Sequence, residues 1–185
     1  MTKKEIRLYI KHLKAQFPNS QKEICANLVT QKIEQSNWFI KAKNILTYYS
    51  LPDELNTLPQ LNRWATTKSL YLPRVNNLSL DILPYANTKI GSYNIFEPLG
   101  NNIVHPSTID LIIVPGIAFD SSGVRLGRGK GFYDRLLKET TALKIGICYD
   151  FQLIDNIPHE IHDIPMDAII TPTQQFIINN KHPWQ

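Results

Sequence analysis

Features that would indicate a membrane protein, a secreted protein or a zinc site are missing from this 185-residue sequence. Its two cysteines, Cys25 and Cys148, lie far apart and match no zinc-ligand spacing. Their apolar neighbours predict buried free thiols. No apolar run approaches the roughly 20 residues of a membrane helix, and no signal-peptide core follows the basic N-terminal residues. We therefore expect a protein of the reducing cytoplasm.

Charge of one sign is not concentrated in any long run. The net charge is +4, and five consecutive basic residues do not occur. This balance suits an anionic small molecule but does not by itself indicate nucleic-acid binding. The hydrophobic fraction of 43%, without repeats or low-complexity segments, predicts one globular domain over residues 1–185. We expect it to act as a monomer.

Glycine is scarce overall and concentrated in one place. Five of the eight glycines lie between positions 116 and 131. The basic residues among and just after them are Arg125, Arg128, Lys130 and Arg135. Glycine permits positive φ and close backbone approach, so peptide N–H groups can converge on an anion. The stretch 114–137 (VPGIAFDSSGVRLGRGKGFYDRLL) therefore predicts a phosphate-binding loop.

A helix is predicted near the start of the chain. Thr2 and Glu5 form a capping box, and apolar residues at helical spacing follow until Pro18 interrupts the pattern. Lys3 and Arg7 are four residues apart and share a face of this helix. Taken alone, that pair indicates an ordinary solvated surface.

Three further helices are predicted. Ser20 and Glu23 repeat the capping signal for the second one. Its expected buried face consists of Ile24, Leu28 and Ile33. A helix capped by Asn56 or Thr57 is expected to run through residue 64, and another over 131–139 follows the glycine-rich stretch.

β-Branched and aromatic residues predict strands over 44–50, 69–73, 78–85, 109–114, 144–149, 163–171 and 175–178. The nearly continuous apolar run at 109–114 is typical of a central parallel strand, whereas 78–85 is expected to be antiparallel and half exposed. Segment 89–98 is predicted to be irregular. Strands and helices alternate around the glycine-rich stretch, which implies right-handed crossovers. The sequence thus predicts a three-layer α/β domain with a mainly parallel sheet and a Rossmann-like core.

Two acidic residues, Asp53 and Glu54, follow the strand predicted over 44–50. Open α/β sheets bind ligands at the carboxyl ends of strands, although an acidic pair after a proline is more often a solvated turn. Glu97 is the one carboxylate in segment 89–98. Irregular segments of this kind wall a pocket in some proteins and only connect elements in most.

The glycine-rich stretch matches neither of the common nucleotide-binding motifs. A Walker A loop needs a glycine where this chain has Val124 and a hydroxyl residue where it has Gly131. A dinucleotide loop needs unequal spacing, whereas Gly127, Gly129 and Gly131 are evenly spaced. Asp150 ends the next strand about 20 residues on, where a ribose-binding acid is found. With the glycine spacing wrong, we interpret Asp150 as part of a strand-end turn.

The side chains of this stretch suit polyphosphate binding. Arg125 and Arg128 can hold phosphate oxygens through planar guanidinium groups, and Lys130 adds a compact charge. Tyr133 can stack on a flat ring or donate a hydrogen bond. Asp134 would repel phosphate unless a divalent cation lay between them, which predicts a metal ligand. The alternative is an ion pair of Asp134 with a nearby base, either Arg128 or Lys138.

The segment PGIAFDSSGVRLGRGKGFYDRLL resembles the signature of the 5-formyltetrahydrofolate cyclo-ligases, also called methenyltetrahydrofolate synthetases. The first helix, YYSLPDE, YLPRV, GSYNIFEP and HDIPMDAIIT follow that family's order, so the resemblance covers nearly the whole chain. It implies a fold related to sugar-phosphate isomerases and CoA-transferases. It also implies that ATP and Mg²⁺ are used to convert 5-formyltetrahydrofolate, with or without a polyglutamate tail, to 5,10-methenyltetrahydrofolate, ADP and phosphate. The formyl oxygen would be phosphorylated before the ring closes.

The same resemblance assigns roles to positions of this chain. Arg125, Lys130 and Tyr133 would be catalytic. ATP would be bound by Lys3, Lys4, Arg7, Arg125, Gly127, Arg128, Gly129, Lys130, Gly131, Phe132 and Tyr133. This assignment replaces the surface interpretation of the Lys3 and Arg7 pair.

The folate contacts that the resemblance implies are Tyr49, Glu54, Tyr93, Arg128, Gly129, Lys130, Gly131 and Phe132. Glu54 would accept hydrogen bonds from the pterin, while Tyr49 and Tyr93 would line the pocket. Tyr93 stands where relatives can carry tryptophan. Phe132 stands where many relatives have tyrosine, so the aromatic face is kept and a hydroxyl is lost. Mg²⁺ would be held by Asp134 and Asp163, with His162 as an orienting neighbour.

Two other classes of function compete with this one. A sugar-phosphate isomerase or acyl-CoA enzyme would share the sheet and the glycine-rich loop but would not need Asp134 and Asp163 as metal ligands. A non-enzymatic nucleic-acid-binding module is favoured only by the positive charge, and we rank it last. We therefore predict small-molecule substrates, no nucleic-acid partner and no membrane association.

Overall fold

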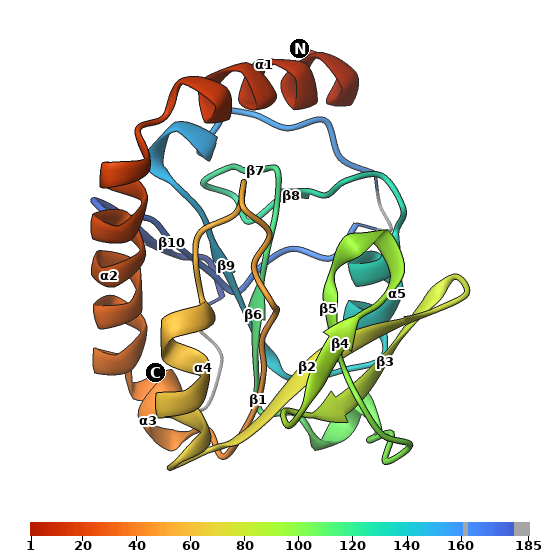
Figure 1. Ribbon diagram of the computed structural model, residues 1–185. Helices are drawn as coiled ribbons and strands as arrows, with labels where there is room; N and C mark the ends of the chain where they lie inside the picture. Colours follow the sequence, from red (N-terminus) through yellow and green to blue (C-terminus); the bar gives the residue numbers. More distant parts are fainter. Residues whose placement is uncertain (161–162, 180–185) are drawn as a thin grey trace.

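The computed structural model describes residues 1–160 and 163–179, and its centre is a seven-stranded sheet in the order β11-β10-β9-β6-β1-β2-β3 (Figure 1). The strands from β10 to β2 run parallel, and each edge strand is antiparallel to its neighbour. The predicted mainly parallel α/β fold is confirmed. In the part of the chain that the structure describes, no helix is long and apolar enough to cross a membrane.

The middle of the sheet is apolar on both faces. Its strands are β1 (Asn44–Leu46), β6 (Leu111–Val114), β9 (Leu143–Ile147) and β10 (Ala168–Ile170). Successive side chains point to opposite faces. Ile45 and Ile113 therefore pack in one apolar cluster, while Leu46 and Ile112 pack in another. This alternation gives the sheet a separate core on each face.

Antiparallel strands close both edges. β2 (Ser69–Asn76) and β3 (Ser79–Pro84) form a hairpin, which confirms the predicted half-exposed strand. β2 runs further than predicted because its pairing continues to the turn, where Asn77 has a φ of 53°. β11 (Gln175–Ile177) pairs with β10 at the other edge.

β1 is shorter than the strand predicted over 44–50, because side-chain hydrogen bonds close a loop after Leu46. The Thr57 hydroxyl donates to the carbonyl oxygen of Tyr48 at 2.8 Å. The Tyr48 hydroxyl donates to the carbonyl oxygen of Leu55 at 2.9 Å. These bonds satisfy backbone carbonyls without a strand partner. They also fix the loop over 47–57 at the carboxyl end of β1.

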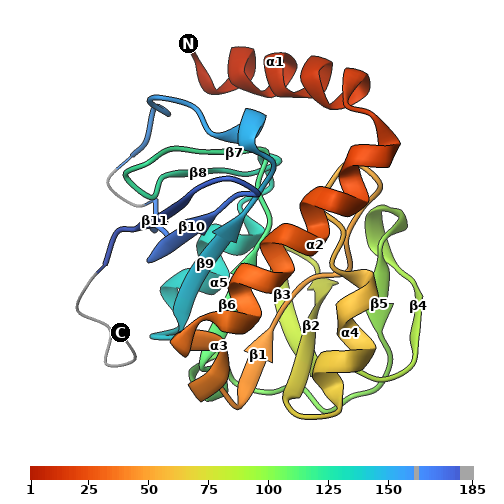
Figure 2. The ribbon, with the colours of Figure 1, turned by 90° about the vertical axis from the view of Figure 1, so that its left-hand side faces the viewer.

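Helices cover the two faces of the sheet and make three layers. α2 (Asn19–Gln35), α3 (Asn37–Lys41) and α4 (Leu58–Ala65) lie on one face, and α5 (Phe132–Lys138) lies on the other (Figure 2). α4 and α5 were predicted from the sequence, whereas α3 was not. Aromatic packing joins the first layer, with the Phe39 and Trp64 rings 5.0 Å apart.

The predicted start of the second helix is wrong, and of its predicted buried face only Ile33 is confirmed. α2 begins at Asn19 after Pro18, without a side-chain cap, so Ser20 and Glu23 form no capping box. Ile24 and Leu28 are 60% and 41% exposed. The face toward the sheet instead consists of Ala26, Val29, Thr30 and Ile33. Smaller residues occupy this face because they allow the helix to approach the sheet, which the hydrophobicity pattern does not reveal.

The cysteines agree only partly with their prediction. Both are free thiols, as expected. Cys148 is buried in the core, whereas Cys25 on α2 is only half-buried. Burial raises the pKa of the Cys148 thiol well above its ordinary range. Cys148 therefore behaves as an apolar core residue.

Segment 89–98 is not irregular. β4 (Thr88–Ile90) and β5 (Phe96–Pro98) form a hairpin beside β2. Its turn contains Tyr93 and Asn94, whose φ angles of 57° and 59° fall in the left-handed region. The prediction missed this hairpin because each strand is only three residues long.

The first helix is confirmed as α1 (Lys3–Gln16), including both hydrogen bonds of the predicted capping box. Ile6 and Ile10 bury its apolar face. They share a cluster with Ala118 and Leu126 of a second small hairpin, formed by β7 (Ala118–Phe119) and β8 (Arg125–Leu126). α1 therefore packs on the hairpin that leads into the glycine-rich loop.

The turn of that second hairpin depends on Asp120, which is 2% exposed. Its Oδ1 accepts from the Ser122 N–H at 3.0 Å, the Ser122 hydroxyl at 2.6 Å and the Val124 N–H at 3.1 Å. Its Oδ2 accepts from the Ile157 N–H at 3.1 Å. These donors replace the water that the buried carboxylate has lost.

Asp120→Ala is expected to lower the free energy of unfolding by about 3 kcal/mol, because buried N–H groups would lose their acceptor. Urea denaturation followed by circular dichroism measures this loss. Asp155→Ala removes an exposed carboxylate and is the control, with an expected change below about 0.5 kcal/mol. Similar small losses in both variants would show that Asp120 does not anchor the turn.

Candidate active site

The strand order reverses between β1 and β6. The sheet continues from β1 to β2 on one side and from β6 to β9 on the other, so the connections leaving these two strands diverge. Open α/β sheets bind ligands at such a switch point. A cavity of about 440 Å³ lies here. It is lined by Tyr48 and Tyr49, which follow β1, and by Pro115 and Gly116, which follow β6.

The glycine-rich loop, residues 125–134, forms one wall of this cavity. Gly129 and Gly131 have φ angles of 92° and 68°, a left-handed conformation that glycine adopts without strain. The Arg7 Nε donates to the carbonyl oxygen of Gly127 at 3.0 Å. α1 therefore holds the loop from outside through Arg7.

Aromatic and apolar side chains form another part of the wall. Tyr49, Tyr93 and Phe132 line the cavity, and the rings of Tyr93 and Phe132 are 6.0 Å apart. The ring of Phe96, which is not part of the lining, lies 4.8 Å from that of Tyr49. The Lys130 Nζ lies 5.8 Å from the centre of the Tyr93 ring. The remaining apolar contacts in the cavity include Pro73, Val75 and Leu80. Such a surface suits a flat heterocycle.

Asp134 is paired with Arg125, and not with Arg128 or Lys138 as the sequence-based alternative proposed. The Arg125 Nη2 donates to the Asp134 Oδ1 at 2.6 Å. The Arg125 side chain is 6% exposed, whereas that of Asp134 is 36% exposed. The pair forms because the loop over 127–131 turns the chain back and brings the first turn of α5 to the end of β8.

Asp163, the second predicted metal ligand, lines the same cavity. Its Oδ2 accepts from the Lys3 Nζ at 3.1 Å and from the Glu160 N–H at 2.9 Å. Among the described residues, no group of three or more His, Cys, Asp and Glu side chains could hold a metal ion. A metal at this place would therefore need oxygens from a bound ligand as well. His162 lies outside the described residues.

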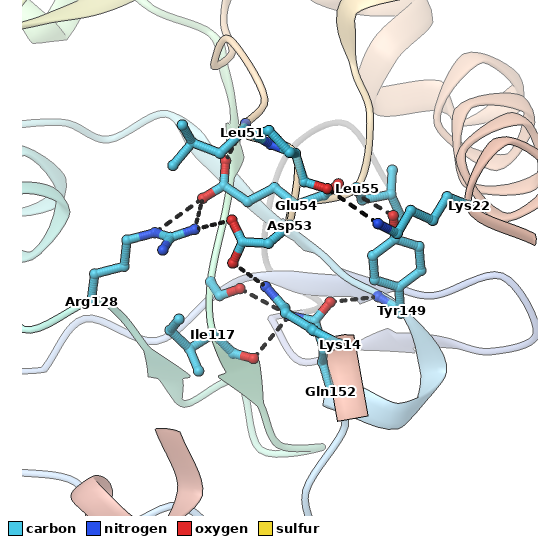
Figure 3. Close-up of polar contacts among 12 residues, drawn as sticks. Lys14, Lys22, Leu51, Asp53, Glu54, Leu55, Ile117, Arg128, Tyr149 and Gln152 are labelled. Atoms are coloured by element: carbon cyan, nitrogen blue, oxygen red, sulfur yellow. Dashed lines mark hydrogen bonds and ion pairs between the residues drawn. The ribbon is translucent and has the colours of Figure 1, made fainter. Parts of the chain in front are cut away.

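Asp53 and Glu54 are paired with a cation of the glycine-rich loop (Figure 3). The Arg128 Nη2 lies 2.7 Å from the Asp53 Oδ1 and 3.0 Å from the Glu54 Oε1. The Leu51 N–H donates to the other oxygen of Glu54 at 3.0 Å. Burial alone would lower the pKa of Arg128, but the two carboxylates raise it. The turn that the sequence left ambiguous is therefore part of the site.

The buried hydroxyl of Tyr133 has no hydrogen-bond partner among the described residues. The Arg125 Nε is likewise buried without such a partner. The Arg125 guanidinium lies 5.4 Å from the centre of the Tyr133 ring. Burial raises the pKa of Tyr133 well above its ordinary value, so the hydroxyl remains a donor. An unpaired buried polar group costs about 1–3 kcal/mol, and both residues line the cavity. Both atoms are buried, so a ligand would contact them only after the surrounding side chains move.

Comparison of the whole sequence with known protein families identifies the family of this chain. A model described as the 5-formyltetrahydrofolate cyclo-ligase family matches residues 1–172. The chain belongs to that family. It is 32% identical to the cyclo-ligase of Haemophilus influenzae, with 91% of this chain and 96% of the relative covered. The cyclo-ligase of Escherichia coli is 31% identical, with coverages of 87% and 94%.

Comparison with solved structures supports the assignment to the cyclo-ligase family. The structure of Aquifex aeolicus 5,10-methenyltetrahydrofolate synthetase has a TM-score of 0.90 and 31% identity, covering 98% of this chain and 95% of its own. A Mycoplasma pneumoniae synthetase with a TM-score of 0.77 and 24% identity shares the fold. The family predicted from the sequence is thereby confirmed, as is the prediction that the chain is an enzyme.

Nearly all positions that the cyclo-ligase resemblance implied line this cavity, and their roles remain predictions. Lys4 differs, because it is exposed on α1 and does not belong to the lining. Sequence reasoning gave little weight to Glu97, which is 5% exposed, lines the cavity and accepts from the Val75 N–H at 3.1 Å. Its signal was one carboxylate within an aromatic segment, which a surface connection would also show.

Tyr133→Phe is expected to leave the free energy of unfolding unchanged or raise it by about 1 kcal/mol, because it removes a buried hydroxyl without a partner. We expect kcat/KM of the cyclo-ligase to fall about tenfold, since the hydroxyl would be lost to the ligand. Urea denaturation and steady-state kinetics measure the two effects.

The control for this prediction is Tyr149→Phe. The Tyr149 hydroxyl donates to the carbonyl oxygen of Glu54 at 3.2 Å, so its removal should cost about 1 kcal/mol of stability. A Tyr133→Phe variant with reduced stability and full activity would contradict the ligand role of this hydroxyl.

Proposed function

We propose that the chain converts 5-formyltetrahydrofolate to 5,10-methenyltetrahydrofolate and uses ATP, which becomes ADP and phosphate. The observation that carries this proposal is the joint lining of one cavity. A cation-bearing glycine-rich loop and an aromatic wall with a carboxylate meet there. A polyphosphate and a reduced pterin need these two kinds of surface, and a transfer between them needs both in one place.

The cations around the loop support the nucleotide part of the proposal. Lys3, Arg7, Arg125, Arg128 and Lys130 all line the cavity. Three of these cations are paired with carboxylates of the same lining, so the expected triphosphate would compete with those carboxylates for them. Arg125 and Arg128 offer planar forks for phosphate oxygens, and Lys130 offers a point charge.

The aromatic wall supports the folate part. Tyr49, Tyr93 and Phe132 line the cavity and provide flat faces for the pterin and the aminobenzoyl ring. Glu54 is an acceptor with a nearly buried side chain, and the pterin amino group and ring N–H are donors. We propose that Glu54 fixes the orientation of the pterin.

The chemistry requires positioning and charge neutralisation rather than a protein nucleophile. The formyl oxygen attacks the γ-phosphorus of ATP, and ADP leaves. The second folate nitrogen then attacks the activated carbon and forms a C–N bond. That nitrogen loses its proton, the C–O bond breaks and phosphate departs. In this proposal Arg125 and Lys130 neutralise the transferred group, and Tyr133 donates a hydrogen bond to it.

We further propose that Mg²⁺ accompanies the nucleotide, with Asp134 and Asp163 as its protein ligands. Mg²⁺ commonly uses one or two carboxylates together with water and substrate phosphates, so two acids in one cavity fit it. When bound, it would offset phosphate charge. Arg125 and Lys3 hold the two carboxylates until then.

The direct test adds 5-formyltetrahydrofolate, ATP and Mg²⁺ to the purified protein and follows methenyl absorbance together with ADP release. Both products should form in equal amounts, and EDTA should stop the reaction. Lys130→Ala is expected to reduce kcat/KM for ATP about 100-fold while circular dichroism stays unchanged. Turnover without ADP, or no turnover at all, would refute the proposed function.

Glu54→Gln is expected to raise the KM for 5-formyltetrahydrofolate about tenfold, because an amide replaces one acceptor oxygen with a donor. The KM for ATP should change little. Steady-state kinetics with each substrate varied in turn measure both constants. Glu139→Gln, which changes an exposed carboxylate, is the control. If only the KM for ATP moved, the pterin role of Glu54 would be wrong.

A further inference from the structure

Four charged side chains of alternating sign form a chain from the end of α1 to the cavity (Figure 3). The Lys14 Nζ lies 3.2 Å from the Asp53 Oδ2, and the other Asp53 oxygen lies 2.7 Å from the Arg128 Nη2. The same Arg128 nitrogen lies 3.0 Å from Glu54. Lys14 and Asp53 do not line the cavity, whereas Arg128 and Glu54 do. This row of ion pairs therefore connects two residues outside the cavity, Lys14 and Asp53, to two residues that line it, Arg128 and Glu54.

In this position Arg128 pairs with Glu54, and it cannot bind the nucleotide phosphates at the same time. Its guanidinium lies on the Glu54 oxygen that would accept from the pterin, with the Nε at 3.4 Å from that oxygen as well. A bound triphosphate would attract the same guanidinium. Once Arg128 turns to phosphate, Glu54 keeps the Leu51 N–H and has an oxygen available for the pterin.

The departure of Arg128 would also remove one counter-ion from Asp53. Burial alone would raise the pKa of Asp53, but Lys14 and Arg128 together lower it. Lys14 remains beside Asp53 when Arg128 leaves, so the carboxylate is not left without a partner. Leaving a partly buried charge unpaired is unfavourable, which gives Lys14 a defined role.

Lys14 is held in place for this role. Its side chain is only 8% exposed, and burial lowers its pKa although Asp53 opposes that shift. Lys3, Arg7 and Lys14 follow at spacings of four and seven residues, which places them on one face of α1. Lys3 and Arg7 contact Asp163 and Gly127, so all three cations face the site.

We propose that Lys14 and Asp53 are positioning residues that hold Arg128 across Glu54 and let it move to the nucleotide at small cost. This inference rests on the proposed function, because it assigns phosphate and pterin as the alternative partners. Lys14 supplies the charge that stays with Asp53 in both states. Neither residue touches the reacting atoms.

The test uses full-length variants Lys14→Met, Lys14→Arg, Asp53→Asn and the double variant Lys14→Met/Asp53→Asn. Dissociation constants are measured for a non-hydrolysable ATP analogue with Mg²⁺ and for 5-formyltetrahydrofolate, and KM and kcat are measured by turnover. Lys22→Met is the matched control. The Lys22 Nζ donates to the carbonyl oxygen of Pro52 in the same loop, at 3.4 Å.

Lys14→Met should weaken binding of the ATP analogue about tenfold and raise the KM for ATP similarly, because release of Arg128 would leave Asp53 unpaired. kcat at saturation should stay within about threefold. Lys14→Arg should restore binding. The double variant should also return to within about threefold of the wild type, because no carboxylate remains to be unpaired.

A packing role for Lys14 makes the opposite prediction for the double variant, which would bind as poorly as Lys14→Met. That result, or unchanged binding in Lys14→Met, would overturn the proposal. If Lys14→Met does not fold, Lys14→Gln replaces it in the same comparison. A wild type that binds both ligands without turnover would refute the proposed reaction, and the binding constants would still decide the role of Lys14.

Discussion

The parallel pairing of β1 with β6 is the constraint on which the rest of the site depends. Ile45 pairs with Leu111 and Leu46 with Ile112, and all four side chains are fully buried. The sheet grows away from this pair in both directions, so neither connection covers the carboxyl ends. The loop over 47–57 and the glycine-rich loop therefore meet at the same cavity.

α1 adds to this arrangement by combining an apolar face with a row of cations. Ile6 and Ile10 are completely buried against the hairpin before the glycine-rich loop. Each contributes about 1.5–3 kcal/mol by burial, which is enough to hold nearby charges close together. Lys3, Arg7 and Lys14 are thereby fixed beside three different parts of the site. The cations adjoin the apolar face of α1, so the packing of Ile6 and Ile10 also fixes where the three cations lie.

The cavity keeps polar groups that are not optimal for stability alone. The Tyr133 hydroxyl and the Arg125 Nε lack partners among the described residues, and Glu97 is buried with a single backbone donor. Unpaired buried groups lower stability, and functional sites commonly retain them because the function requires these groups. Asp120 shows the contrast, since its carboxylate has four donors and serves the fold.

The sequence by itself determined the features that depend on neighbouring residues. Periodicity gave the main strands and α1, its cap followed from Thr2, and local glycine content indicated the loop, because capping and backbone freedom act within a few residues. Only the tertiary structure decided which charges meet. Arg128 reaches Glu54 across 74 positions, and Lys3 reaches Asp163 across 160. It also decided that α2 exposes Ile24, because the approach of a helix to the sheet depends on both packed surfaces, and no local pattern contains the second one.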